Sequence, residues 1–175
     1  MNRRRVLTAL AGVGLTGGSL WVARNGLGSS SSDRLPLTVE TLDANGSAAG
    51  SATVPTPGTV TVVDLFATWC APCDDQLAEL NELEPAYDSV SFVSVTNERP
   101  GETLTREDIA DWWNRNGGDW TVGVDPGSEL LTAFGASGLP FIVIVDADGE
   151  PVYEHGGLAS AATLRSRLDP LVGDD

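Results

Sequence analysis

The sequence contains no lysine, only two cysteines, one histidine and one methionine among its 175 residues. Two cysteines cannot build a scaffold of several disulfides, and with a single histidine they cannot complete a four-ligand zinc site within one chain. Ten arginines against 25 acidic residues give a formal net charge of −15. This balance excludes a general nucleic-acid-binding protein, because such proteins depend on basic side chains that contact phosphates.

The composition is otherwise that of a globular protein, with 41% hydrophobic and 20% charged residues, and the length suits one domain with a short appendage. Residues 35–175 contain 24 of the acidic residues but only five arginines. Such a surface repels itself in dilute buffer, and salt removes the repulsion because the Debye length falls to about 3 Å at 1 M. Together with the absence of lysine, this favours a protein adapted to strong brine, as in halophilic archaea.

Residues 1–34 have the pattern of an export signal. Three arginines at positions 3–5 precede an uncharged run over residues 6–23, and a serine-rich linker follows at residues 29–32. A basic start before an apolar run is typical of export signals, and the paired arginines ahead of Val-Leu resemble the twin-arginine motif. The run is also about long enough to span a bilayer. The sequence therefore predicts export to the outer face of the cytoplasmic membrane or beyond, with membrane contact only through residues 6–23 if the leader stays uncleaved.

Residues 35–175 are predicted to form one α/β domain with a mixed sheet. Two short alternating runs at residues 37–42 and 51–54 flank the turn-forming pair Asn45-Gly46 and predict an opening hairpin. Beyond the hairpin, strands and helices alternate and then end in a second hairpin and a helix, an order typical of an α/β sandwich. Periodicity predicts strands at 59–67, 90–95, 120–124, 141–145 and 152–154, and helices at 73–87, 105–116, 128–134 and 159–168.

Cys70 and Cys73 are separated by two residues at the predicted junction of a strand and a helix. Cysteines at this spacing can close a disulfide, and a helix N-terminus favours the thiolate form of Cys70, which attacks disulfides. Cys73, one turn further on, is expected to be more buried and to resolve the mixed disulfide. A bridge across four residues closes too small a loop to add much stability. The pair is therefore interpreted as redox-active rather than structural.

Residues 63–73, Val-Asp-Leu-Phe-Ala-Thr-Trp-Cys-Ala-Pro-Cys, resemble the active-site segment of the thioredoxin superfamily, and residues 138–140, Gly-Leu-Pro, are similar to its cis-proline segment. The opening hairpin, the helical insertion at residues 102–117 and the leader narrow the resemblance to TlpA/ResA-like thiol-disulfide oxidoreductases. Over residues 37–172 the resemblance implies a thioredoxin-like three-layer sandwich that exchanges disulfides with protein substrates. It implies no bound cofactor or metal, and a membrane electron donor if the protein works as a reductase.

The resemblance also implies which residues shape the substrate site. Pro140 is expected to be cis and to face the cysteine pair, where it presents its neighbour's backbone to an extended substrate. Trp69, Pro72 and Leu139 are expected to form the groove around it.

Asp64 is the only charged residue in an apolar predicted strand, six residues before Cys70. Burial disfavours the charged form of a carboxyl group, so the pKa of Asp64 should be raised and the group could exchange a proton with a neighbouring thiol. In thioredoxins an aspartate at this position is taken to help deprotonate the second cysteine, here Cys73. The alternative is that Asp64 lies in water at a strand end.

The sequence departs from its relatives at two positions. Gln76 stands where ResA-like members involved in cytochrome c maturation typically carry a glutamate, and Ala78 stands where many relatives have a helix-kinking proline. Together with the thioredoxin-like Asp64, Gln76 favours a broader exported disulfide reductase over a role in cytochrome c maturation. Asp74 and Asp75 suit the first turn of a helix. They also oppose the thiolate of Cys70, so we expect a more reducing disulfide than in oxidase-type relatives.

The same pair of cysteines also suits a second function. A copper-delivery protein on this fold would bind metal through Cys70, Cys73 and a histidine, and His155 is the only candidate in the sequence.

Overall fold

The computed structural model describes residues 34–173, so residues 1–33 of the predicted leader lie outside the described residues. Within residues 34–173, no helix has the length and hydrophobicity to cross a membrane. The strands are β1 (Leu37–Thr41), β2 (Gly50–Val54), β3 (Thr61–Phe66), β4 (Ser91–Thr96), β5 (Thr121–Val124), β6 (Phe141–Val145) and β7 (Pro151–Gly156); the helices are α2 (Ala71–Leu83), α3 (Arg106–Arg115), α4 (Glu129–Ala133) and α5 (Ala161–Leu168), with a 3₁₀ turn η2 (Glu84–Ala86).

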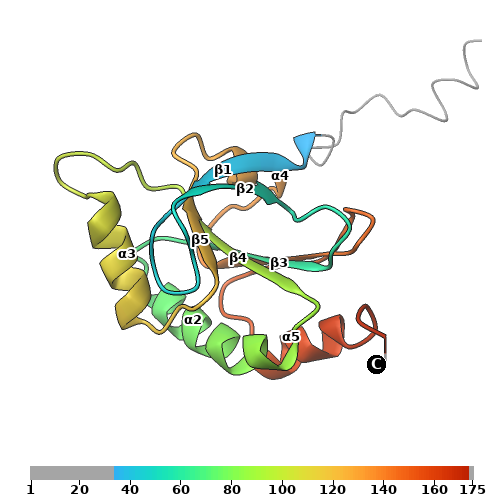
Figure 1. Cartoon of the computed structure of the whole chain (residues 1–175). Coiled ribbons are helices and arrows are strands. Elements are labelled where there is room, and N and C mark those ends of the chain that lie inside the picture. Colours follow the sequence, from blue (N-terminus) through green and yellow to red (C-terminus); the bar gives the residue numbers. More distant parts are fainter. Residues whose placement is uncertain (1–33, 174–175) are drawn as a thin grey trace, which may run out of the picture. The chain divides into compact units, whose positions relative to one another are not determined.

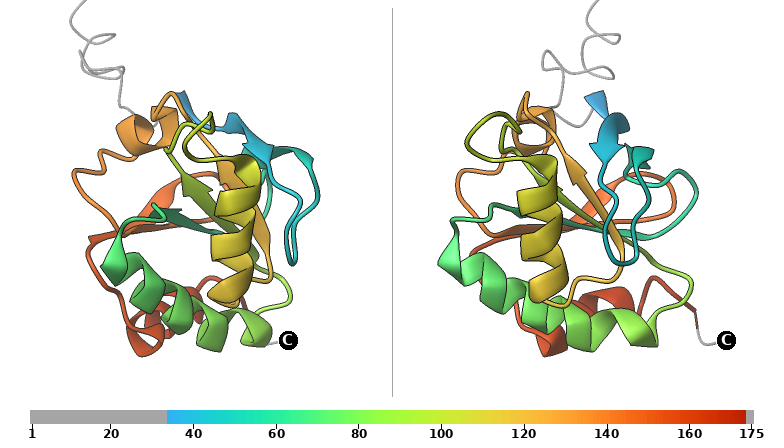
Figure 2. Two further views of the ribbon diagram at one scale, coloured as in Figure 1. Left: turned by 90° about the vertical axis from the view of Figure 1, so that its left-hand side faces the viewer. Right: turned by 60° about the vertical axis from the view of Figure 1, so that its left-hand side comes forward.

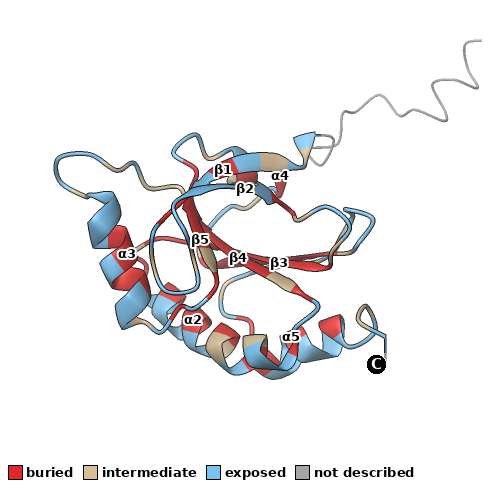
Figure 3. Ribbon diagram, viewed as in Figure 1, coloured by how far each residue is buried: buried red, intermediate tan, exposed pale blue. Residues whose placement is uncertain are grey.

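The seven strands form one mixed sheet in the order β2-β1-β5-β4-β3-β6-β7 (Figure 1). Parallel pairing joins β3 to β4 and β4 to β5, and every other neighbouring pair is antiparallel. All six residues of β3 are buried, as Figure 3 shows in red. The sequence of such a strand is a nearly continuous run of β-branched and apolar residues, because both of its faces are covered. The predicted α/β sandwich with a mixed sheet is confirmed.

Helices α2, α3 and α5 cover one face of the sheet, and α4 lies on the other (Figures 1 and 2). The alternation of side chains along β3 shows the two layers: Val62 and Phe66 belong to the core that includes α2, α3 and α5, whereas Val63 and Leu65 belong to the core that includes α4. The same alternation places Asp64 on the face that packs against α2.

The opening hairpin docks its turn on the end of α3. Gly46 takes a positive φ of 68° in the predicted Asn45-Gly46 turn, and a Cβ there would lie 1.9 Å from the carbonyl carbon of Asp119. The backbone N–H of Asn45 donates to Oδ1 of Asn114, and the Trp113 indole N–H donates to the Asn45 carbonyl. Only glycine therefore fits at this turn.

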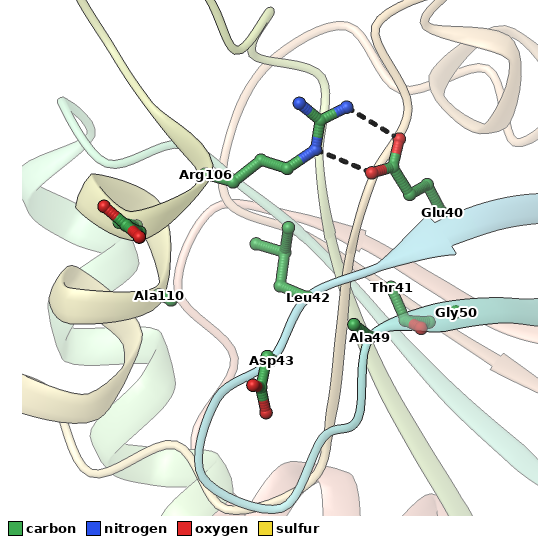
Figure 4. A pocket seen from close by; sticks show the side chains of 9 residues that line it. Glu40, Thr41, Leu42, Asp43, Ala49, Gly50, Arg106 and Ala110 are labelled. Carbon is green, nitrogen blue, oxygen red and sulfur yellow. Dashed lines mark hydrogen bonds and ion pairs between the residues drawn. The ribbon is translucent and has the colours of Figure 1, made fainter.

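The hairpin also contacts the start of α3. Arg106 donates two hydrogen bonds to the carboxylate of Glu40, from Nε at 2.6 Å and from Nη2 at 2.9 Å (Figure 4). The pair closes one side of a surface pocket of about 520 Å³ between the hairpin and α3. No residue that lines this pocket belongs to the cysteine pair or its surroundings; the lining is Glu40, Thr41, Leu42, Asp43, Ala49, Gly50, Arg106, Glu107 and Ala110.

Helix α3 begins at a capping box. The Thr105 hydroxyl accepts from the backbone N–H of Asp108, whose carboxylate accepts from the N–H of Thr105. Trp112 and Trp113 are both buried, and Trp112 stacks on Phe66 with ring centroids 5.0 Å apart. The helix of the predicted insertion is thus packed into the main core through its two tryptophans.

The net charge of −15 predicts that salt stabilises the folded protein. Raising NaCl from about 0.1 M to about 1 M shortens the Debye length from about 10 Å to about 3 Å, so we expect the free energy of unfolding to rise by at least about 1 kcal/mol, which raises the Tm of a chain of this size by about 2–4 °C. A variant in which Glu82, Asp88 and Glu102, all exposed, become amides should gain less from salt. Denaturant titration at several salt concentrations measures both, and a stability that falls with salt would contradict the expectation.

Candidate active site

The two cysteines form a disulfide where β3 leads into α2. Cys70 is the N-cap of α2 with an extended backbone, and Ala71 and Pro72 form the start of the helix. The Cys70–Cys73 bond joins Cα atoms 5.3 Å apart, and the N–H of Cys73 donates to the carbonyl of Cys70 at 2.9 Å. The first turn of the helix therefore brings the two sulfur atoms together, as the spacing predicts.

Helix α2 differs from the predicted helix at both ends. It begins two residues before Cys73, because Pro72 needs no hydrogen-bond acceptor in a first turn. It ends at Leu83, four residues short of the predicted end, and continues as the 3₁₀ turn η2. Pro85 explains the change, because it has no N–H to donate to the carbonyl four residues earlier.

The disulfide is covered, whereas the residue in front of it is exposed. Cys70 is 5% exposed and Cys73 is 2% exposed, so the expectation that Cys73 is more buried holds by a small margin. Trp69 is 74% exposed, the largest value among the exposed large hydrophobic side chains of the described chain, and Pro72 is also exposed. An exposed apolar side chain thus lies directly before a covered disulfide.

The Leu139–Pro140 peptide bond is cis, as the resemblance implied. Pro140 is buried and Leu139 is half-buried. The carbonyl of Pro140 accepts a 2.8 Å hydrogen bond from the N–H of Gly157, which follows β7. The cis-proline segment is thus held to the loop that leads into α5.

Asp64 lies inside β3 and not at a strand end. It is 3% exposed, and its Oδ2 accepts a 2.9 Å hydrogen bond from the Ser94 hydroxyl on β4. Its Oδ1 is buried and has no hydrogen-bond partner. Burial raises the pKa of Asp64 from an ordinary value of 3.8 to about 7, although the hydrogen bond from Ser94 lowers it. The predicted raised pKa is confirmed, and the carboxyl can gain or lose a proton near neutral pH.

Gln76 is fully buried and binds the backbone that leads into α5. Its Nε2 donates to the Ala159 carbonyl at 3.1 Å, and its Oε1 accepts from the Ala159 N–H at 2.7 Å. Glu79, one turn further along α2, accepts from the N–H of Ala161. A carboxylate at this position could accept from the Ala159 N–H but has no hydrogen to donate to the Ala159 carbonyl, so an amide makes both bonds at any pH.

Glu98 is a residue of this region that the sequence analysis missed. Its carboxylate accepts hydrogen bonds from the backbone N–H and the hydroxyl of Thr68, each at 2.8 Å, and from the Thr96 hydroxyl at 3.0 Å. Glu98 therefore fixes the residue directly before Trp69. The position of Glu98 in the sequence could have identified it. The carboxyl ends of the parallel strands β3 and β4 lie at the same edge of the sheet, and Glu98 lies two residues beyond β4.

His155 is not placed as a metal ligand. It lies on β7, where its ring stacks on Tyr153 with centroids 6.1 Å apart. Among residues 34–173, no group of three or more histidine, cysteine, aspartate or glutamate side chains could hold a metal ion. The alternative prediction of copper delivery through Cys70, Cys73 and His155 is therefore not favoured.

Comparison with known proteins places the chain in a family. The chain belongs to the Redoxin family, whose model matches residues 30–163. It is 29% identical over 142 residues to the thiol:disulfide interchange protein CycY of Rhizobium leguminosarum bv. viciae, covering 77% of this chain and 73% of CycY. It is 30% identical over 106 residues to the thiol-disulfide oxidoreductase ResA of Bacillus thuringiensis, covering 61% of this chain and 60% of ResA.

Solved structures show the same fold. StoA of Bacillus subtilis superposes with a TM-score of 0.62 at 20% identity, over 77% of this chain and 98% of StoA. A secreted disulfide oxidoreductase of Mycobacterium tuberculosis gives a TM-score of 0.64 at 18% identity, over 78% of this chain and 96% of the other. The predicted TlpA/ResA-like member of the thioredoxin superfamily is confirmed, and the names of the relatives support thiol–disulfide exchange through the Cys70–Cys73 pair.

The raised pKa of Asp64 predicts how stability depends on pH. The unfolded carboxyl ionises near 3.8 while the folded one keeps its proton to about 7, so stability is lost as pH rises through this interval and the loss is complete above it. We expect Asp64→Asn to stabilise the protein relative to wild type at about pH 8 by several kcal/mol, and far less at about pH 4. Unfolding titrations in molar salt at both pH values measure the difference. A difference that does not change with pH would contradict the buried ionisation.

The double hydrogen bond of Gln76 predicts a second pH effect. In Gln76→Glu the new carboxyl must stay protonated to donate to the Ala159 carbonyl, so its pKa is raised and stability is lost as pH rises through that pKa. The loss at about pH 8 should be about 1–3 kcal/mol or more, the cost of a buried unsatisfied polar group. Ala78→Glu adds the same charge at an exposed position of α2 and serves as the control. Equal pH profiles for the two variants would show that the Gln76 amide is not required.

Proposed function

We propose that the protein is an exported protein-disulfide reductase that exchanges disulfides with protein substrates through Cys70 and Cys73. The disulfide at the N-terminus of α2 carries this proposal, since it joins residues only three apart in the chain and lies next to the exposed Trp69. The arginines at positions 3–5 and the uncharged run over residues 6–23 support export, with a leader that is either cleaved or kept as an anchor.

The proposed reaction transfers two electrons from the protein to the substrate. The Cys70 thiolate attacks the substrate disulfide, a mixed disulfide forms at Cys70, and the first substrate sulfur leaves as a thiolate. Cys73 then gives its proton to Asp64 and attacks the sulfur of Cys70. The Cys70–Cys73 disulfide forms, the second substrate sulfur leaves, and the substrate is reduced to a dithiol.

The groove for the substrate is proposed to lie between the α2 terminus and the cis-proline segment. Trp69 and Pro72 supply the exposed apolar side, and Leu139 and Pro140 supply the other side. An extended substrate can pair with backbone groups of the cis-proline segment while its side chains contact the indole.

Negative charge at the start of α2 supports the reducing direction. Asp74 and Asp75 are exposed and directly follow Cys73. Their carboxylates oppose the effect of the helix dipole on a thiolate at Cys70, and a less stable thiolate makes the reduced form a stronger reductant. A reductase outside the cytoplasm needs its own source of electrons, so a membrane electron donor is proposed to reduce the pair after each cycle.

The reduction potential of the Cys70–Cys73 pair tests the proposed direction. We expect a value near or below about −220 mV, as for reductases, because of the acidic start of α2. The measurement is an equilibrium titration against dithiol buffers with thiol trapping, in molar salt. A value near about −120 mV would instead identify an oxidant that introduces disulfides, contrary to the proposal.

Two variants separate the local charge from the overall charge. Asp74→Asn with Asp75→Asn should raise the potential by about 10–40 mV, because each charge near a helix terminus contributes about 0.3–1 kcal/mol. Asp88→Asn with Glu82→Gln removes the same charge from exposed positions far from the N-terminus of α2 and should leave the potential unchanged. The effect of the first pair should shrink as salt is raised. Equal effects of the two pairs would show that the position of the charge does not matter.

A further inference from the structure

A chain of buried hydrogen bonds ends at the carboxyl group of Asp64. The indole Nε1–H of Trp120 donates to Oγ of Ser94 at 3.0 Å, and the hydroxyl of Ser94 donates to Oδ2 of Asp64 at 2.9 Å. All three side chains are buried, with exposures of 6%, 0% and 3%. The other carboxyl oxygen, Oδ1, is buried and has no partner.

The direction of this chain is fixed by its first member. An indole N–H can only donate, so the oxygen of Ser94 must accept from Trp120. A serine hydroxyl has one proton, and that proton therefore points to Oδ2 of Asp64. A proton on Oδ2 would occupy the line along which Ser94 donates, so Ser94 would have to turn its own hydrogen away and this hydrogen bond would have to reverse its direction. A proton on Oδ1 leaves the hydrogen bonds of Trp120 and Ser94 unchanged.

We propose that Trp120 and Ser94 are positioning residues that confine the exchangeable proton of Asp64 to Oδ1. The proposal rests on the proposed function, in which Asp64 accepts the proton of Cys73. Ser94 holds Oδ2 as the carbonyl oxygen of the protonated group, and Oδ1 then carries the hydrogen. The same hydrogen bond stabilises the carboxylate after the proton leaves, since hydrogen bonds to charged groups are stronger than those to neutral ones.

The proton balance of the resolving step follows from this arrangement. Cys73 loses its proton to Oδ1 of Asp64 and its sulfur attacks the sulfur of Cys70 in the mixed disulfide. The bond between Cys70 and the substrate sulfur breaks, and the electron pair leaves with the substrate thiolate. Asp64 returns its proton to solvent or to the leaving thiolate, so no further oxidant or reductant takes part.

Few other titratable groups face Asp64. Cys73 is the one titratable side chain, once reduced, among the buried residues of α2, and the buried residues of α3 and α5 include none. On the neighbouring strands Asp64 is paired with Ser94 of β4 and Ile142 of β6. Ile142 is paired in turn with His155 of β7, which places that ring two strands, or about 10 Å, along the sheet. Among residues 34–173, the Ser94 hydroxyl is thus the one hydrogen-bond partner of the carboxyl.

Infrared spectroscopy of the protonated carboxyl tests which oxygen carries the proton. At about pH 5.5 exposed carboxyls are ionised, whereas Asp64 keeps its proton, and subtracting the Asp64→Asn spectrum isolates its carbonyl stretch. If the proton is on Oδ1, the carbonyl oxygen is Oδ2 and Ser94→Ala moves the band to higher frequency, because a hydrogen bond is lost. If the proton is on Oδ2, the carbonyl oxygen is the unpartnered Oδ1 and the band does not move in this direction, which would overturn the proposal.

A pH titration gives the second readout. Ser94→Ala should raise the proton affinity of Asp64 about tenfold, because a hydrogen bond to a charged group is lost, and Trp120→Phe should raise it by a smaller factor. Both variants should shift the pH profile for resolution of a mixed disulfide at Cys70 in the same direction. Ser91→Ala is the matched control. Ser91 lies on β4 like Ser94, but its hydroxyl is hydrogen-bonded to Thr56, so this variant should leave the pH profile unchanged.

The outcomes separate this proposal from the function it rests on. If Asp64→Asn leaves the pH profile of resolution unchanged, Asp64 does not accept the proton and the proposed mechanism fails. If Asp64→Asn flattens the profile while Ser94→Ala leaves both the profile and the infrared band unmoved, Asp64 keeps its role and only the positioning by Ser94 is overturned. Movement of the profile and of the band in Ser94→Ala, with no movement in Ser91→Ala, supports the proposal.

Discussion

Strand β3 is buried on both faces along its whole length, and the position of every reactive group follows from this. Its end leads directly to Cys70, which puts the disulfide at the edge of the sheet and at the start of α2. Because side chains alternate along a strand, a charged residue at position 64 has no route to solvent. A carboxyl in this place can ionise only against a large desolvation cost, so it responds to pH in the range where thiols exchange protons.

The segments around the disulfide are held by hydrogen bonds between side chains and distant backbone. Glu98 binds Thr68 across 30 residues of sequence, and Gln76 binds Ala159 across 83. The carbonyl of Pro140 accepts from the loop that also contains Ala159. Each of these segments is thus fixed to a distant part of the chain before any substrate arrives. The entropy of ordering them is lost on folding and not on binding, which favours contact with an extended partner.

Local sequence predicted the elements well because each has its own pattern, such as the periodicity of the helices or the turn at Gly46. It also identified the cysteine pair and Asp64, since a lone charge in an apolar run is visible without a structure. The end of α2 was placed four residues too late, although Pro85 gave a local signal. The hydrogen bonds of Gln76 to Ala159, of Glu98 to Thr68 and of Ser94 to Asp64 could not be predicted from local pattern, because each joins segments at least 30 residues apart.

Salt affects the acidic residues near the disulfide differently, depending on whether they are exposed or buried. Asp74 and Asp75 face solvent beside the disulfide, so dissolved ions screen their effect on Cys70. Asp64 lies in the core, where ions do not enter and where burial and Ser94 set its pKa. Raising the salt concentration therefore weakens the effect of Asp74 and Asp75 on Cys70, whereas the burial that raises the pKa of Asp64 stays the same. Salt is consequently expected to change the charge effects at the surface far more than the protonation of the buried carboxyl.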